Sequence, residues 1–142
     1  MPVEIVDSDG GLGNLVTACG DVTEEGYLQV MRIHLLDDPE RFAKYRYTLA
    51  DYTELGEFSV SAGAIGSVSR MCVEAAAGNP NAVVALIVTE DYMFGLARMW
   101  EQLSDQTGWE IEVFRTIERA KDWIRDRVRA RWNITDLTFC AD

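Results

Sequence analysis

Three short apolar runs, each followed by a segment with helical periodicity, dominate the pattern of this chain. They are YRYTLADYTEL at 45–55, AVVALIVTEDY at 82–92 and WEIEVFRTI at 109–117. Strands that alternate with amphipathic helices are typical of a parallel sheet whose crossover helices pack on it. The second run is continuously apolar, so we expect a strand covered on both faces at the centre of the sheet. The pattern predicts an α/β fold.

The region before these runs predicts a β-hairpin. The segments PVEIVDSD and LVTACGD contain β-branched residues and are joined by the glycine-rich stretch GGLGN. Glycine-rich loops also bind phosphate, but such loops lead into a helix, whereas a strand is expected after Gly13. We therefore expect a turn here and no phosphate site.

Capping residues mark where helices begin. Thr23 precedes two glutamates and an apolar stripe, so a helix is expected to start there and to end before Pro39, which opens a short second turn. Ser59 or Ser61 is the expected N-cap of the next helix. Cys72 falls on the apolar face of that helix, where a thiol packs as a small hydrophobic group.

A short tail follows the last predicted helix. We assign residues 1–132 to one domain and residues 133–142 to a C-terminal tail. The tail alternates weakly, with Leu137 and Phe139 among its apolar positions, as a terminal strand would. A segment of this length is too short to be a domain, so we expect it to cover part of the core or to pair with a neighbouring subunit.

Composition limits the classes of partner. The chain has 142 residues, 48% of them hydrophobic, and a net charge of −11. This negative charge disfavours nucleic acid and anionic membranes, because both attract positive charge. No export signal or bilayer-spanning run is evident, so a cytoplasmic location is expected. The three cysteines are far apart and odd in number, so we expect reduced thiols.

One segment departs from the overall acidity. Residues 119–131 contain six arginines and lysines against two aspartates. Such a run is typical of a solvated helix face whose cations complement the C-terminal end of the helix. The alternative is a basic patch that docks an acidic surface, such as that of a second copy of the chain, and so forms a homodimer.

No residue cluster has the spacing of a recognised catalytic or metal site. His34 with Asp37 and Asp38 falls short of a metal signature, and we expect a surface histidine with an ordinary pKa. The segment SVSAG at 59–63 lacks the first glycine of a nucleophile elbow, and the only histidine precedes it. We expect no catalytic residue, no metal and no cofactor.

Carboxylates at strand ends supply an enzyme hypothesis, which we rank last. Asp51 is expected where the first parallel strand ends, and Glu90 and Asp91 follow the second. Open α/β sheets bind ligands at this edge, and paired carboxylates can transfer protons. Exposed acids at strand ends are nevertheless common, so this pattern alone points weakly to catalysis.

Three segments resemble a known family. TLADYTEL, NAVVALIVTEDYMFGLARMWEQL and EVFRTIERAKDWI look like the SpoIIAA-like, or STAS-domain, family of small bacterial proteins, over about residues 3–128. The resemblance implies an α/β fold with a mostly parallel mixed sheet, covering helices and an N-terminal β-hairpin. In classical members a serine at the start of a helix is phosphorylated, which makes Ser61 and Ser59 the phosphorylation candidates here.

Two non-enzymatic hypotheses follow from this resemblance. The first is a regulatory module that binds a protein partner through the surface around Asp51, Ser59 and Ser61. The alternative is a carrier of a small apolar, lipid-like ligand, since the family is related in fold to CRAL-TRIO carriers. The expected ligand or partner surface at the carboxyl ends of two strands consists of Asp51, Tyr52, Phe58, Asp91, Tyr92 and Phe94.

Overall fold

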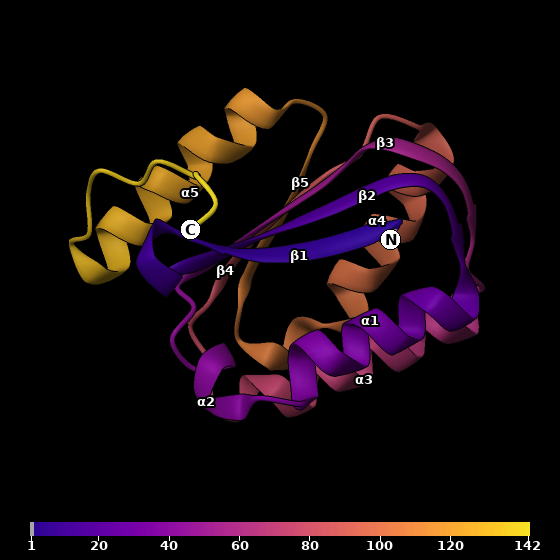
Figure 1. Ribbon diagram of the computed structural model, residues 1–142, viewed down its shortest axis with the longest axis horizontal. Coiled ribbons are helices and arrows are strands. Elements are labelled where there is room, and N and C mark those ends of the chain that lie inside the picture. Colours follow the sequence, from indigo (N-terminus) through magenta and orange to yellow (C-terminus); the bar gives the residue numbers. More distant parts are fainter. Residues whose placement is uncertain (1) are drawn as a thin grey trace.

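The computed structural model describes residues 2–142 and contains one five-stranded sheet with helices on both faces (Figure 1). The strands lie across the sheet in chain order: β1 (Val3–Ser8), β2 (Gly13–Thr23), β3 (Tyr47–Ser59), β4 (Val83–Ile87) and β5 (Glu110–Phe114). β1 is antiparallel to β2, and every other neighbouring pair is parallel. The expected mixed sheet with an N-terminal hairpin is confirmed.

Helices connect these strands. They are α1 (Glu24–Leu36), α2 (Pro39–Phe42), α3 (Ala62–Ala76), α4 (Asp91–Leu103) and α5 (Ile117–Trp132), with short 3-10 turns η1 (Asp9–Gly11) and η2 (Asp105–Thr107). Thr23 caps α1 by accepting a hydrogen bond from Gly26, and Ser61 caps α3 by accepting one from Ala64, as predicted. Within residues 2–142, no helix has the length and apolar character needed to cross a membrane.

The helices divide between the two faces of the sheet. Helices α1, α3 and α4 cover one face and α5 covers the other (Figure 1). Strand alternation drives this division: in β3, Ala50 and Tyr52 join the cluster under α1, α3 and α4, whereas Tyr47 and Leu49 join the cluster under α5. We call these clusters the α1-side core and the α5-side core.

Two expectations about the strands are wrong. β3 does not end at Asp51 but continues to Ser59, because β2 pairs with it to its end while β4 pairs with it only as far as Asp51. β4 is buried along its whole length, as expected, yet the middle strand of the sheet is β3. The overhanging ends of β2 and β3 form a two-stranded arm.

The glycine-rich stretch forms the hairpin turn. Gly10 and Gly11 have positive φ angles within η1, a conformation that glycine adopts without strain. Gly13 begins β2, and a Cβ atom at that position would overlap the ring of Tyr47. These glycines therefore serve the turn and a close approach of β2 to a tyrosine.

The C-terminal tail packs on this turn (Figure 1). Leu137 and Phe139 are buried in the α5-side core, and an isolated bridge joins Ala141 to Ser8 where an additional strand was expected. The carboxylate of Asp9 accepts hydrogen bonds from Thr138 N–H at 2.8 Å, Thr138 Oγ1 at 2.7 Å and Phe139 N–H at 3.0 Å. We call these three bonds the Asp9 latch. Residue 1 of the assigned domain lies outside the described residues.

Hydrogen bonds keep the Asp9 carboxylate ionised. Burial raises its pKa, but hydrogen bonds from Tyr47 and from Thr138 and Phe139 outweigh burial and leave the pKa below its ordinary value. The hydroxyl of Tyr47, which donates to Asp9 at 2.6 Å, also contacts Ser8 at the same distance. Tyr47, a residue of the α5-side core, is thus hydrogen-bonded to the turn, and the turn is hydrogen-bonded to the tail through Asp9.

Candidate functional site

An apolar cavity of about 90 Å³ lies in the α1-side core, between the sheet and helices α1, α3 and α4. Among residues 2–142, the side chains that line it include no Asp, Glu, Lys or Arg. Its helical walls include Tyr27 and Met31 of α1, Val68 and Cys72 of α3, and Met93 and Trp100 of α4. His34, Leu96, Trp100 and Trp109 are partly exposed, so the cavity reaches the surface at these side chains.

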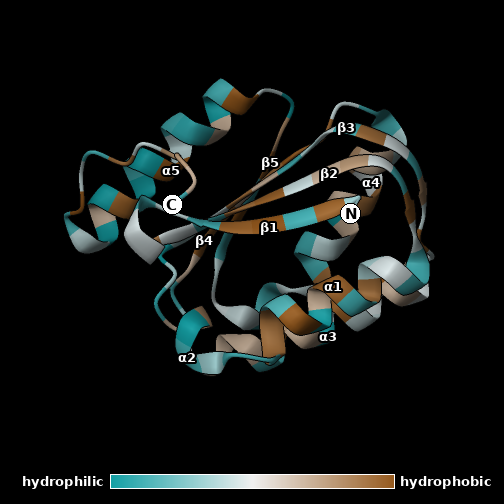
Figure 2. Cartoon of the chain, viewed as in Figure 1, coloured by the Kyte–Doolittle hydropathy of each residue, from teal (hydrophilic) through white to brown (hydrophobic). Residues whose placement is uncertain are grey.

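The periodicity of each element brings these side chains together. Thr48, Ala50 and Tyr52 line the cavity because alternate residues of β3 point to the same face. On α1, residues three and four positions apart share a face, which places Tyr27, Met31 and His34 along the cavity. Figure 2 shows apolar residues along the strands and on α1 and α3.

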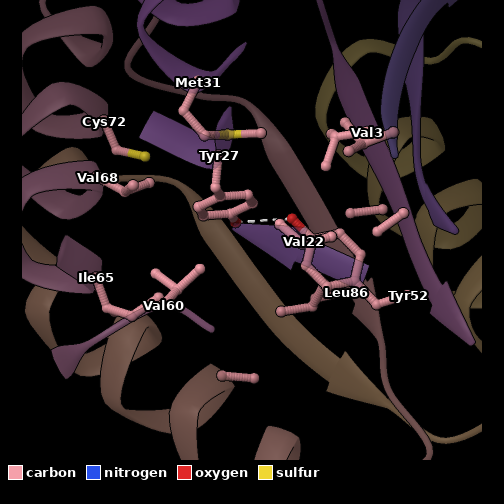
Figure 3. Close-up of a cluster of buried hydrophobic side chains, with 14 of the residues drawn as sticks. Val3, Val22, Tyr27, Met31, Tyr52, Val60, Ile65, Val68, Cys72 and Leu86 are labelled. Carbon is pink, nitrogen blue, oxygen red and sulfur yellow. Dashed lines mark hydrogen bonds between the residues drawn. The ribbon is translucent and has the colours of Figure 1, made fainter. Parts of the chain in front are cut away.

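Two tyrosine hydroxyls meet beside the cavity. Tyr27 Oη and Tyr52 Oη lie 2.7 Å apart, in a pair that joins α1 to β3 (Figure 3). The Tyr27 ring packs edge-on against Phe58, with a centroid distance of 5.2 Å. Burial raises the pKa of Tyr27 to about 12 and raises that of Tyr52 well above its ordinary value. Both hydroxyls are therefore neutral at physiological pH.

Cys72 and Trp100 form another part of the wall. Cys72 is 3% exposed, as expected for a packing thiol, and burial raises its pKa to about 12. A thiol with such a pKa supplies almost no nucleophilic thiolate near pH 7. The buried indole Nε1–H of Trp100 faces the Cys72 sulfur, which is a weak acceptor, and has no stronger partner within residues 2–142.

The surroundings and the pKa of His34 differ from the sequence-based expectation. Its ring lies 5.6 Å from the ring of Phe42 and 5.9 Å from that of Tyr45. Burial among these rings lowers the pKa of His34 to about 4, and the positive charge of Arg41 contributes further. The prediction of an ordinary pKa is wrong, because the turn after α1 packs over part of the side chain and leaves it only partly exposed.

A shallow groove adjoins the cavity on the outside. It has a volume of about 240 Å³ and is lined by Val3 and Ile5 of β1 and Val30 and Ile33 of α1, among others. His34, Phe42 and Tyr45 line both the groove and the cavity. These three rings therefore separate the inner space from the outer one.

The structure brings only part of the predicted ligand surface together. Tyr52 and Phe58 line the cavity. Tyr92, in contrast, is 52% exposed, and the ring of Phe94 lies under the guanidinium of Arg115 at 4.5 Å. The sequence reasoning missed Tyr27, His34 and Trp100 as cavity residues; the apolar spacing of α1 and α4 indicated buried helix faces but not a cavity beside them.

The predicted carboxylates do not form a pair around a ligand. Asp51 lies between two residues of β3 that face the α1-side core, so it points away from the cavity, and it accepts hydrogen bonds from Thr53. Asp91 forms an ion pair with Arg115 at 3.0 Å. Glu90 is exposed at the start of α4. Among residues 2–142, no group of three His, Cys, Asp or Glu side chains is placed to hold a metal ion.

The two serines occupy different positions. Ser61 is exposed at the N-terminus of α3, where its backbone N–H donates to Glu24 Oε1 at 2.8 Å. This contact joins the first turn of α1 to the start of α3. Ser59 is the exposed last residue of β3 and is paired with Thr23 of β2.

The basic segment 119–131 lies on α5, and several of its cations are paired within the chain. Arg127 and Arg131 contact the carboxylate of Glu110 at 2.8 Å and 2.6 Å. The ion pairs Arg125–Asp122 and Arg129–Asp126 lie along the helix itself. These contacts attach α5 to the edge strand β5 and reduce the charge available to a partner.

The mixed sheet, its N-terminal hairpin and the helices on both faces define an α/β protein with a SpoIIAA-like fold. The chain is similar to the crystal structure of an uncharacterized protein from the DUF3478 family with a SpoIIAA-like fold, from Shewanella loihica PV-4. The two share 22% sequence identity and superimpose with a TM-score of 0.51, over 86% of this chain and 91% of that chain. The fold expected from the sequence resemblance is thereby confirmed.

Comparisons at the level of sequence add nothing to this result. No family model matches the chain, and no curated protein matches it. Identity of 22% supports the fold alone. Function must therefore be argued from the cavity and its surroundings.

Proposed function

We propose that this protein is a non-enzymatic binder of a small apolar molecule, which it holds in the cavity of the α1-side core. The observation that carries the proposal is the cavity itself, which is lined by hydrocarbon and aromatic side chains and reaches the surface beside Trp100 and Trp109. Pockets of this character, with few polar groups, are the usual sites of small-molecule binding.

Dimensions limit the ligand. A dry cavity of about 150 Å³ accommodates benzene, so a cavity of about 90 Å³ suits a molecule or chain end of only a few carbon atoms. The adjoining groove of about 240 Å³ offers space for the remainder of a longer molecule if the ring of His34 rotates. Cavity and groove together reach the lower end of the roughly 300–1,000 Å³ typical of ligand pockets.

The chemistry of the lining supports binding without catalysis. Burial keeps the tyrosine hydroxyls and the Cys72 thiol protonated near pH 7, and it keeps His34 neutral. A general base or nucleophile needs a pKa closer to the working pH or an activating partner. The cavity thus offers apolar contact and neutral hydrogen-bonding groups.

Nuclear magnetic resonance titration with short ketones and alkenes tests this proposal. We expect chemical-shift changes to concentrate on Tyr27, Ala97 and Trp100, which line the cavity. The variant Ala97→Leu fills the cavity and should abolish these changes. Ala130→Leu, on the exposed face of α5, is the matched control and should leave them unchanged. Absence of binding, or binding that survives Ala97→Leu, would refute the proposal.

A second candidate function is a phosphorylation-controlled interaction module. The observation in its favour is that Ser61 is exposed while its backbone N–H is bound to Glu24. A phosphate on Ser61 would accept hydrogen bonds from the free amides of α3 and would repel the Glu24 carboxylate. Phosphorylation would thereby loosen α1 from α3, and both helices line the cavity.

Intact-mass analysis of protein purified from its own host tests this second candidate. We expect a mass increase of one phosphate that is absent from Ser61→Ala and retained in Ser59→Ala. A phosphate that persists in Ser61→Ala would contradict the assignment to Ser61. An unmodified mass for the wild-type protein would count against the switch.

A further inference from the structure

We infer that the ligand of the α1-side cavity is an uncharged molecule with a hydrogen-bond acceptor, of the ketone or ester type, attached to a short apolar body. This inference rests on the proposed function and specifies its ligand. Its basis is the cavity wall, where hydrogen-bond donors remain unused and charged side chains are missing among residues 2–142.

The tyrosine pair contributes the first unused donor. Two hydroxyls carry two hydrogen atoms, but the single bond between Tyr27 and Tyr52 uses only one of them. The two side chains are 7% and 6% exposed, and the pair has no other hydrogen-bonding partner within residues 2–142. One buried O–H therefore remains available whichever tyrosine donates to the other.

The indole N–H of Trp100 is the second unused hydrogen-bond donor. Its Nε1 atom is buried without an oxygen or nitrogen partner within residues 2–142. Trp100 lines the same cavity as Cys72 and the two tyrosines. A buried donor without a partner is destabilising, and an incoming acceptor would recover that loss.

The rest of the wall excludes other classes of ligand. Among residues 2–142, no lysine or arginine lines the cavity to neutralise a bound acid, and no carboxylate lines it to accept from a bound amine. A charge placed there would be desolvated without a counter-ion. A carbonyl oxygen can accept a hydrogen bond from either donor and adds no donor of its own.

A pair of isosteric probes tests the inference. Butanone is compared with the alkene in which a methylene group replaces its carbonyl oxygen. Both are titrated into the wild type and into the double variant Tyr27→Phe/Tyr52→Phe by nuclear magnetic resonance. Both tyrosines must change, because removing one hydroxyl would leave the other free to donate. Tyr92→Phe, at an exposed position, is the control.

The expected result is a difference between the probes. The double variant should bind the ketone roughly three- to tenfold more weakly than the wild type does, while the alkene should bind equally well or better. In the wild type the Trp100 indole N–H resonance should move downfield with the ketone only. If both probes respond equally to the double change, the inference is overturned while the apolar binding site stands. If neither probe binds the wild type, the proposed function fails as well.

Discussion

The two faces of the sheet are packed by different means. On the α5 side, Ala120, Ile124 and Val128 of one helix are 0% exposed and lie against apolar residues of β3 and β4. On the α1 side, three helices pack against one another as well as against the sheet, and a cavity of about 90 Å³ remains among them. Small and β-branched residues on a single helix permit a close approach to a twisted sheet.

This difference shows where a fold of this kind leaves room for a ligand. Longer side chains, such as those of Tyr27, Met31 and Trp100, span the distance between three helices and the sheet without filling it. Protein interiors are normally packed as densely as organic crystals, so a persistent apolar space is a specific feature of that face. We therefore expect substitutions on the two faces to have different effects.

The largest effect is expected at the tail on the α5 side. Phe139 is 6% exposed, its ring lies 5.1 Å from that of Tyr47, and the guanidinium of Arg125 lies 4.9 Å from its centroid. Phe139→Ala should lower the free energy of unfolding by about 3–5 kcal/mol. Urea denaturation followed by circular dichroism measures this, with the exposed Thr135→Ala as control. A loss below about 1 kcal/mol would show that the tail is not part of the core.

A smaller effect should separate two buried helical alanines that lie on opposite faces of the sheet. Ala120 on α5 and Ala97 on α4 are both buried, but only Ala97 borders the cavity. Ala120→Leu should cost about 2 kcal/mol because the added carbons have no space, whereas Ala97→Leu should cost less than about 1 kcal/mol. Thermal or urea unfolding of the two variants measures the loss of stability in each. Equal losses would mean that the two faces are equally tightly packed.

The smallest effect depends on pH and arises at His34. Its pKa is about 4 in the folded protein, compared with about 6.5 when unfolded, because burial and then Arg41 disfavour the charged form while Asp7 opposes them weakly. The unfolded chain therefore takes up the proton first as the pH falls from 6.5 to 4. Stability should fall by about 1–2 kcal/mol across this window, after allowance for partial exposure.

The variant His34→Gln checks the assignment. It should remove most of the loss between pH 6.5 and 4 but should leave any loss below pH 4 in place. The Asp9 carboxylate, whose pKa is lowered, contributes to that lower range, because its stabilisation is lost when it becomes protonated. An unchanged pH profile in His34→Gln would assign the loss to another group.

Local patterns were sufficient to predict most of the fold. The apolar runs and the capping residues Thr23 and Ser61 predicted the strands and the helix starts, because both signals depend on neighbours along the chain. The full length of β3 was missed. Its second half contains Glu54, Gly56 and Glu57, which are atypical of a strand, and it is held by pairing with β2, a partner distant in sequence.

The candidate site was predictable only in part. Tyr52 and Phe58 were found because they lie near the ends of an apolar run, and both line the cavity. Tyr27 and Trp100 lie on helices α1 and α4. An apolar stripe on a helix predicts that the stripe is buried, but it does not predict where a cavity remains. The environment of His34 depends on the rings of Phe42 and Tyr45, which reach it through a turn that no local pattern describes.

The Asp9 latch has a further consequence for the order of folding. Its bonds join residues 129 and 130 positions apart, so the chain must close a very long loop before they can form. We expect contacts of such high sequence separation to form late, after the folding transition state. Interactions absent from the transition state slow unfolding and leave the folding rate nearly unchanged. We therefore expect the latch to slow unfolding and so to prolong the native state once it has formed.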